Sequence, residues 1–103
     1  MELKVIGKRY SLATVAAEII QDLGGCDGVT LAHKGKIMIA DGMTEEDTRE
    51  TRIHELFHAI WSAMDIGFSD STEEKICTAL AKGMSAVLSD NDPELMGEFL
   101  YGR

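Results

Sequence analysis

Residues 44–64, TEEDTRETRIHELFHAIWSAM, decide the fold that the sequence predicts. Thr44 followed by three acidic residues is typical of a helix N-terminus, because a Thr side chain caps free N–H groups and acidic groups suit the positive end of the helix dipole. Apolar residues then recur at helical spacing and predict one buried face: Ile53, Leu56, Phe57, Ile60, Trp61 and Met64. Gly67 is expected to end this helix.

The centre of this helix carries the pattern His-Glu-x-x-His at residues 54–58. Four residues advance a helix by slightly more than one turn, so His54 and His58 lie nearly above one another and can reach one metal ion. Glu55 can then reach a water on that metal and act as the general base. The pattern is the zinc metallopeptidase signature, and the less specific interpretation is two ordinary histidines beside a solvated glutamate.

The N-terminal part of the chain predicts a small antiparallel sheet. Residues 3–10 alternate weakly and suit a first strand that ends near Gly7 or runs on to Tyr10. Residues 11–23 fit a helix better than a strand, although both patterns are present. Val29–Ala32 and Lys36–Ala40 are short apolar runs around His33-Lys34-Gly35, which predicts a β-hairpin.

A second long helix is expected after several candidate N-caps at residues 69–72. Its predicted apolar face consists of Ile76, Cys77, Leu80, Met84, Val87 and Leu88. Gly83 in its middle is expected to allow close packing, and Pro93 can open a short terminal helix. The expected fold is therefore α+β in one domain, residues 1–103: a sheet, the motif helix, and a second helix antiparallel to it.

A catalytic zinc needs a third protein ligand. The only other histidine is His33, and no His follows the motif at the spacing H-E-x-x-H-x-x-G-x-x-H. A carboxylate at the start of the next helix, Glu73 or Glu74, is therefore expected. Helix geometry favours Glu73, whereas Glu74 also fits a capping box with Ser71, and both could simply serve the helix dipole. The residues alone leave the choice open, with His33 next in line.

HELFHAIW at residues 54–61, E-E-x-I-C-x-A-L-A at 73–81 and D-N-x-P-E-L at 90–95 resemble small phage and prophage metallopeptidase-like proteins. These look like minimal relatives of the ImmA/IrrE and SprT types, and the resemblance covers roughly residues 37–100. It implies a minimal zincin-like domain of the gluzincin type, with Zn2+ on His54 and His58 and a third ligand on the following helix. The helix pattern of those proteins, E-x-x-V-x-A-L, implies that this ligand is Glu74, with Glu73 as the alternative.

Two functions follow from these residues. The first is hydrolysis of a peptide or protein substrate, in which a zinc-bound water attacks the scissile bond and Glu55 transfers the proton. The strand Lys36–Ala40 is expected to pair with the extended substrate, and Tyr10, Tyr101 and His33 are candidates for stabilising the oxyanion by chemical type alone. The alternative is a non-catalytic phage interaction or regulatory module that zinc only stabilises.

Composition excludes other classes. The chain has 103 residues, a net charge of −8 and a pI near 4.7, which disfavours nucleic acid and anionic membranes as partners. Cys26 and Cys77 are two separate thiols without a C-x-x-C pattern, as expected in a reducing cytoplasm. We expect neither a signal peptide nor a membrane span, because no apolar run is long enough.

Overall fold

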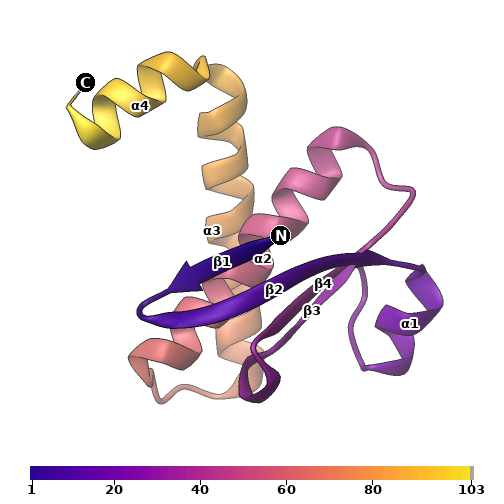
Figure 1. The fold of residues 1–103 in the computed structure, drawn as a ribbon. Helices are drawn as coiled ribbons and strands as arrows, with labels where there is room; N and C mark the ends of the chain where they lie inside the picture. The colour runs from indigo at the N-terminus through magenta and orange to yellow at the C-terminus, as the bar shows by residue number, and fades with distance from the viewer. Residues whose placement is uncertain (103) are drawn as a thin grey trace.

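The computed structural model describes residues 1–102 and has the expected α+β architecture, a small sheet followed by long helices (Figure 1). The elements in chain order are β1 (Glu2–Val5), β2 (Lys8–Val15), α1 (Ala17–Asp22), β3 (Gly28–Leu31), the 3-10 turn η1 (Ala32–Lys34), β4 (Lys36–Ala40), α2 (Glu45–Met64), α3 (Asp70–Asp90) and α4 (Pro93–Tyr101). None of the helices within residues 1–102 is both long enough and apolar enough to cross a membrane.

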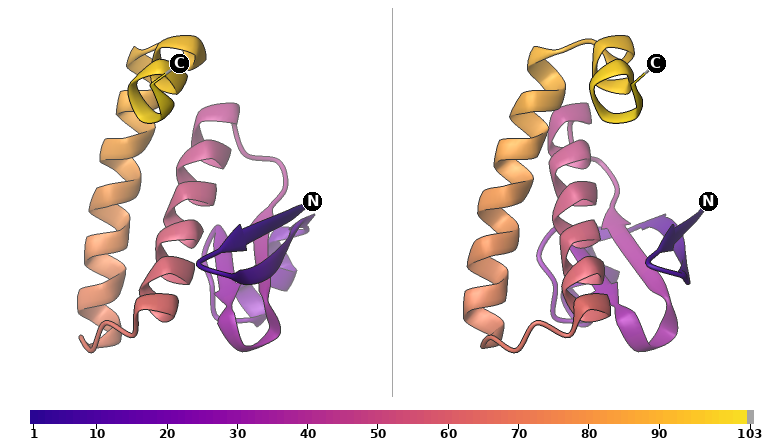
Figure 2. Two further views of the ribbon diagram at one scale, coloured as in Figure 1. Left: turned by 60° about the vertical axis from the view of Figure 1, so that its left-hand side comes forward. Right: turned by 90° about the vertical axis from the view of Figure 1, so that its left-hand side faces the viewer.

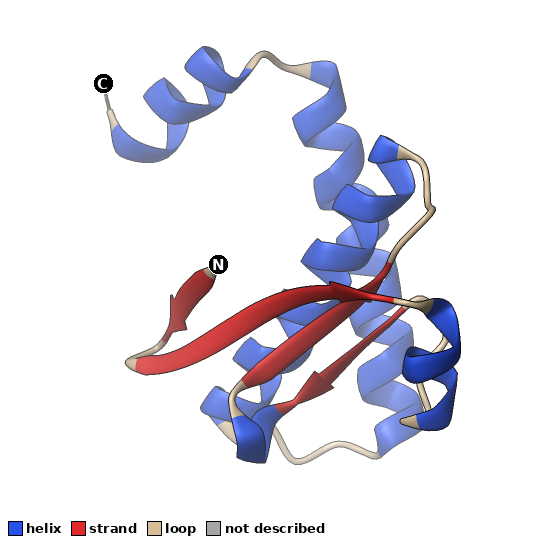
Figure 3. Cartoon of the chain, turned by 45° about the vertical axis from the view of Figure 1, so that its right-hand side comes forward, coloured by secondary structure: helices blue, strands red, loops and turns tan. Residues whose placement is uncertain are grey.

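The sheet has the strand order β1-β2-β4-β3 and is mixed rather than fully antiparallel (Figure 3). β1 and β2 form an antiparallel hairpin, and β3 and β4 form a second one. The two hairpins join through the parallel pair β2 and β4, in which Ser11 is paired with Lys36 and Val15 with Ala40. This parallel join was not predicted, and it leaves β3 as an edge strand.

The prediction of a helix from residue 11 to residue 23 is confirmed for its second half and wrong for its first. β2 continues to Val15, and α1 covers only Ala17–Asp22. The pattern of residues 11–15 suits both structures, so the distant pairing with Lys36–Ala40 decides in favour of the strand. The first strand ends before Gly7, as one of the two predicted alternatives had it, because a tight turn at Ile6 and Gly7, with φ angles of 48° and 82°, separates β1 from β2.

The predicted hairpin around His33-Lys34-Gly35 is confirmed. β3 and β4 are antiparallel neighbours, joined by η1 and by Gly35 in the left-handed conformation with φ 62°. β4 lies inside the sheet, between β2 and β3, so the expectation that β4 pairs with a substrate is wrong. Only the outer strands of a sheet have free backbone groups.

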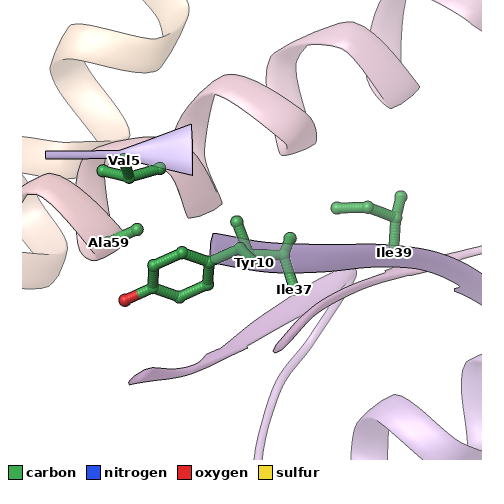
Figure 4. Close-up of a cluster of buried hydrophobic side chains, with 5 residues drawn as sticks. All are labelled: Val5, Tyr10, Ile37, Ile39 and Ala59. Atoms are coloured by element: carbon green, nitrogen blue, oxygen red, sulfur yellow. The ribbon is translucent and has the colours of Figure 1, made fainter. Parts of the chain in front are cut away.

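One face of the sheet packs on α2, and this contact forms the core (Figure 4). The buried cluster contains Val5, Tyr10, Ile37, Ile39 and Ala59. The predicted helix start is confirmed, because the Thr44 side chain accepts a hydrogen bond from the backbone N–H of Asp47 at 3.1 Å. The helix ends at Met64, before the predicted Gly67, and the Met64 side chain is 58% exposed, contrary to the predicted buried face.

α3 runs antiparallel beside α2, as predicted (Figure 2). Its buried residues are small ones, Cys77, Ala81 and Ser85, spaced by four. The predicted face is wrong in part, since Leu80, Met84 and Val87 are 48%, 42% and 45% exposed. Small side chains face α2 because they let the two backbones approach closely. A Cβ at Gly83 would meet nothing within 4 Å, so close packing does not explain this glycine.

α4 is the short terminal helix expected after Pro93. The Asp92 side chain caps it by accepting a hydrogen bond from the backbone N–H of Leu95 at 2.9 Å. The helix turns away from the end of α3 and extends away from α2 (Figure 1). Its apolar residues are therefore largely in solvent: Phe99 is 80% exposed and Tyr101 is 73% exposed.

Candidate metal centre and cleft

Two imidazoles on α2 converge beside the start of α3. The Nε2 atoms of His54 and His58 are 3.1 Å apart, and the ring centroids are separated by 4.9 Å. The side chains are 18% and 16% exposed. This convergence follows from the i, i+4 spacing that the sequence shows, since both side chains leave the same face of the helix.

Glu74 completes a three-residue group with the two histidines. One carboxylate oxygen lies 2.8 Å from Nε2 of His54, and the other lies 2.8 Å from Nε2 of His58. One possible ligand atom from each of the three residues lies within 4.8 Å of the others. A tetrahedral zinc with bonds of about 2.0–2.1 Å would space its ligand atoms about 3.3 Å apart. The residues present therefore fit a single zinc ion.

Glu73, the alternative to Glu74 as third ligand, contacts the outer nitrogen of His58. Its carboxylate accepts a hydrogen bond from Nδ1 of His58 at 2.5 Å, and its side chain is 23% exposed, whereas that of Glu74 is 58% exposed. Ser69 caps α3 by accepting from the N–H of Thr72, so Glu74 is not part of the capping box that the sequence suggested. Histidines that bind metals commonly donate their second N–H to a carboxylate, which fixes the ring.

Glu55 is the only charged residue among the buried ones in the described chain, with 5% of its surface exposed. Thr30 on the edge strand β3 donates a hydrogen bond to one carboxylate oxygen of Glu55 at 2.8 Å. The other oxygen lies 4.0 Å from Nε2 of His54. Gly28 makes room for this arrangement, because a Cβ there would lie 3.0 Å from the Cγ of Glu55. The carboxylate is thus held between β3 and the imidazole pair.

The environment changes the proton affinities of two of these groups. Burial raises the pKa of the Glu55 carboxyl, and the hydrogen bond from Thr30 and the nearby imidazoles only partly offset this. For His58, burial favours the neutral ring, but the hydrogen bond to Glu73 and the charges of Glu55 and Glu74 outweigh it and raise the pKa. Both groups therefore hold a proton more strongly than they would in water.

The group lies in an open cleft of about 1010 Å³ between β3, α2 and the start of α3. Gly28, Val29 and Thr30 all line it. Consecutive residues of a strand point to opposite faces, so a cavity lined by three of them in a row borders the edge of the strand. This edge of β3 is free, because β3 pairs only with β4 in the sheet.

The register shows which backbone groups face the cleft. The N–H of Ala40 donates to the carbonyl of Asp27 at 2.8 Å, which makes these two residues a hydrogen-bonded pair that continues the β3–β4 register. Bonded and non-bonded pairs alternate along antiparallel strands. Val29 is therefore bonded to β4, whereas Gly28 and Thr30 direct their N–H and C=O groups away from β4. The carbonyl of Gly28 is covered by Gly25, whose Cβ would lie 2.4 Å from it, so the groups of Thr30 are the open ones at this edge.

Some predicted residues are not part of the cleft. His33 is exposed in the turn η1, Tyr10 is buried in the core, and Tyr101 is exposed on α4, and none of the three lines the cleft. The roles of Thr30 and Gly28 cannot be predicted from the sequence, because a Thr and a Gly around a short strand are ordinary. Their pairing with the motif is visible only once β3 is placed beside α2.

Comparisons with protein-family models, with curated proteins and with solved structures found no match to this chain in any of the three.

Proposed function

We propose that the chain is a zinc-dependent peptidase that hydrolyses peptide bonds, with His54, His58 and Glu74 as metal ligands and Glu55 as the general base. The observation that carries this proposal is the buried carboxylate of Glu55, 5% exposed, beside a convergent His-His-Glu group in an open cleft. Burial of a carboxylate costs free energy unless a function or a strong partner compensates for it. Glu73 would act as the residue that orients His58.

The chemistry of each residue follows from its position. Zinc held by the three ligands would supply the positive charge that polarises a peptide carbonyl and acidifies water. Glu55 has one oxygen occupied by the hydroxyl of Thr30 and the other free toward the imidazole pair. The free oxygen can accept a proton from water and deliver it to the leaving amine. Burial raises the pKa of this carboxyl, which makes it a stronger base than an exposed glutamate.

An extended peptide suits the cleft better than a compact ligand does. The outward N–H and C=O groups of Thr30 can pair with a peptide backbone as the start of an added strand, which would leave β3 where Gly25 covers the carbonyl of Gly28. The same strand carries the hydroxyl that binds Glu55, so a peptide on this edge would pass directly beside the base. The strand that would pair with an extended substrate is thus β3, and not Lys36–Ala40 as first expected.

The alternative is a non-catalytic module stabilised by zinc. A structural zinc site is usually closed by four protein ligands and does not need a base. Here the described donors number three, the cleft is open, and the glutamate of the motif is buried beside the rings. These features favour catalysis over a structural role.

The test combines metal analysis with peptide cleavage. Protein purified without chelator should carry about one zinc per chain, and His54→Ala and His58→Ala should each lose it. Glu55→Gln should keep its zinc and lose cleavage of a mixed library of unstructured peptides. Glu46→Gln, an exposed change at the start of the same helix, is the matched control. Zinc binding without any cleavage by the wild type would support the structural module, and cleavage that survives in Glu55→Gln would refute the proposed base.

A further inference from the structure

The cleft carries more negative charge than the metal group requires. Beyond the residues of that group, its lining includes four further acidic side chains: Asp27, Glu50, Asp65 and Asp70. The only lysine or arginine among the described lining residues is Lys82, and its Nζ lies 3.8 Å from the carboxylate of Glu50. Three carboxylates are therefore left without a basic partner in the lining.

Acidic residues of α2 lie on both sides of the histidine pair, but the one on the N-terminal side, Glu50, is the carboxylate that Lys82 partners. Along α2, Glu50 precedes His54 by four residues and Asp65 follows His58 by seven. At a rise of about 1.5 Å per residue, the two acidic groups are about 6 Å and about 10 Å along the helix from the nearer histidine. An extended peptide advances about 3.3 Å per residue, so these distances correspond to about two to three peptide residues on either side.

The helix termini make the two ends of the cleft unequal. Asp65 is the C-cap of α2, where the dipole is negative and no basic residue lies in the last turn. Asp70 is in the first turn of α3, where the positive end of the dipole offsets part of its charge. Asp65 should therefore attract a cation more strongly than Asp70 does.

The net charge of −8 does not by itself explain this distribution. Basic residues gather elsewhere, since the β1–β2 hairpin contains Lys4, Lys8 and Arg9 but only one acidic residue, Glu2. The side chains of Arg9 and Glu2 are 74% and 64% exposed, so their contact at 3.4 Å is well solvated. The cleft and the hairpin thus present opposite charges.

We propose that the cleft selects extended peptide segments that carry Lys or Arg two to three residues from the bond held at the histidine pair, on one or both sides. This inference rests on the proposed function, because it names the substrate class of the same site. The free edge of β3 binds the peptide backbone without regard to sequence, and the acidic side chains select the charge. Neutral and acidic segments bind more weakly because nothing replaces the solvation of these carboxylates.

The experiment measures binding separately from cleavage. Zinc-supplemented Glu55→Gln protein is titrated into two fluorescein-labelled twelve-residue peptides that are identical except for two Lys in one and two Glu in the other, flanking a central Ala-Val. The Lys peptide should bind about tenfold more tightly at 50 mM salt, and the ratio should fall to about twofold at 500 mM, where screening is strong. In the same background, Asp65→Asn with Asp70→Asn should lose most of the preference.

The control removes the same amount of charge outside the cleft. Glu94→Gln with Glu98→Gln, both exposed on α4, should keep the full preference. Equal binding of the two peptides, no binding of either, or equal loss of the preference in the two double variants would overturn the inference. If the preference is present but the wild type cleaves neither peptide, the proposed function fails and the charge selection stands. If the wild type cleaves both equally well, the function stands and the selection fails.

Discussion

The two adjacent glutamates at the start of α3 should differ sharply in their effect on zinc affinity. Glu74 contacts Nε2 of both histidines at 2.8 Å, whereas Glu73 contacts only Nδ1 of His58. Glu73→Ala would leave the three ligand atoms intact but free the ring of His58. The loss of such an outer partner weakens metal binding by about 10–100-fold, or about 1.4–2.7 kcal/mol. Glu73→Gln keeps a hydrogen-bond acceptor for His58, so its loss of zinc affinity should lie near the tenfold end of this range.

Glu74→Ala removes a ligand atom and its charge, so its affinity should fall by more than the 100-fold upper limit for an outer partner. The assay is competition for zinc against a chromophoric chelator at pH 7.5, with His54→Ala as the reference for the loss of a ligand. Asp70→Asn is the control for a charge lost from the same helix turn, and it should change affinity by less than about threefold. Small, equal effects of Glu73→Ala and Glu74→Ala would refute the assignment, and the third ligand would have to lie elsewhere.

The remaining predictions concern stability and reactivity. Ile6, a β-branched residue with φ 48°, is strained, so Ile6→Asn should raise the free energy of unfolding by about 0.5–1 kcal/mol in urea denaturation, and a lower value would contradict the turn geometry. Gly28→Ala should destabilise by about 1–3 kcal/mol in the same assay, because its Cβ would lie 2.9 Å from Thr51 and 3.0 Å from Glu55. Burial, followed by the nearby carboxylates, raises the pKa of the Cys77 thiol to about 11, so one thiol should react with a disulfide reagent at pH 8 in the folded protein and two after unfolding. Above a pH of about 9 an unfolded thiol loses its proton while the folded one keeps it, so the melting temperature should fall between pH 9 and 11, and less so in Cys77→Ala. In protein held with zinc at about 100 times its Kd, removing the metal with a chelator should lower the melting temperature by about 10–20 °C. An unchanged melting temperature after metal removal would mean that metal binding does not stabilise the fold.

The motif helix was predictable because its signals are local. The Thr44 cap and the two histidines act within single turns, and both appear in the structure where the sequence suggested. The predicted apolar face is only partly right, since the fully buried residues of α2 are Glu55 and Ala59. The pairing of Glu73 or Glu74 with the histidines needed only a short connection and an antiparallel return. What the sequence could not distinguish was which imidazole nitrogen each glutamate would meet, since that depends on the distance and rotation between two packed helices.

Non-local contacts explain the predictions that failed. Residues 11–15 follow a strand because Lys36–Ala40 lies beside them, and no local pattern reports that pairing. The buried face of α3 was misjudged because hydrophobicity favours large residues, whereas the contact with α2 uses Cys77, Ala81 and Ser85. Thr30 became part of the site only because the sheet places β3 against α2.

The small residues on α3 also make metal affinity sensitive to substitutions that never touch the metal. Helices packed through small side chains lie at the short end of the usual range of about 8–10 Å between axes. Glu74 on one helix reaches the histidines on the other across this short gap. Exchanging Ala81 or Ser85 for a larger side chain would widen the gap, and the carboxylate would move outward with the backbone that carries it. If zinc binds as proposed, its affinity would therefore change with packing two or three helical turns away, while every ligand residue stays the same.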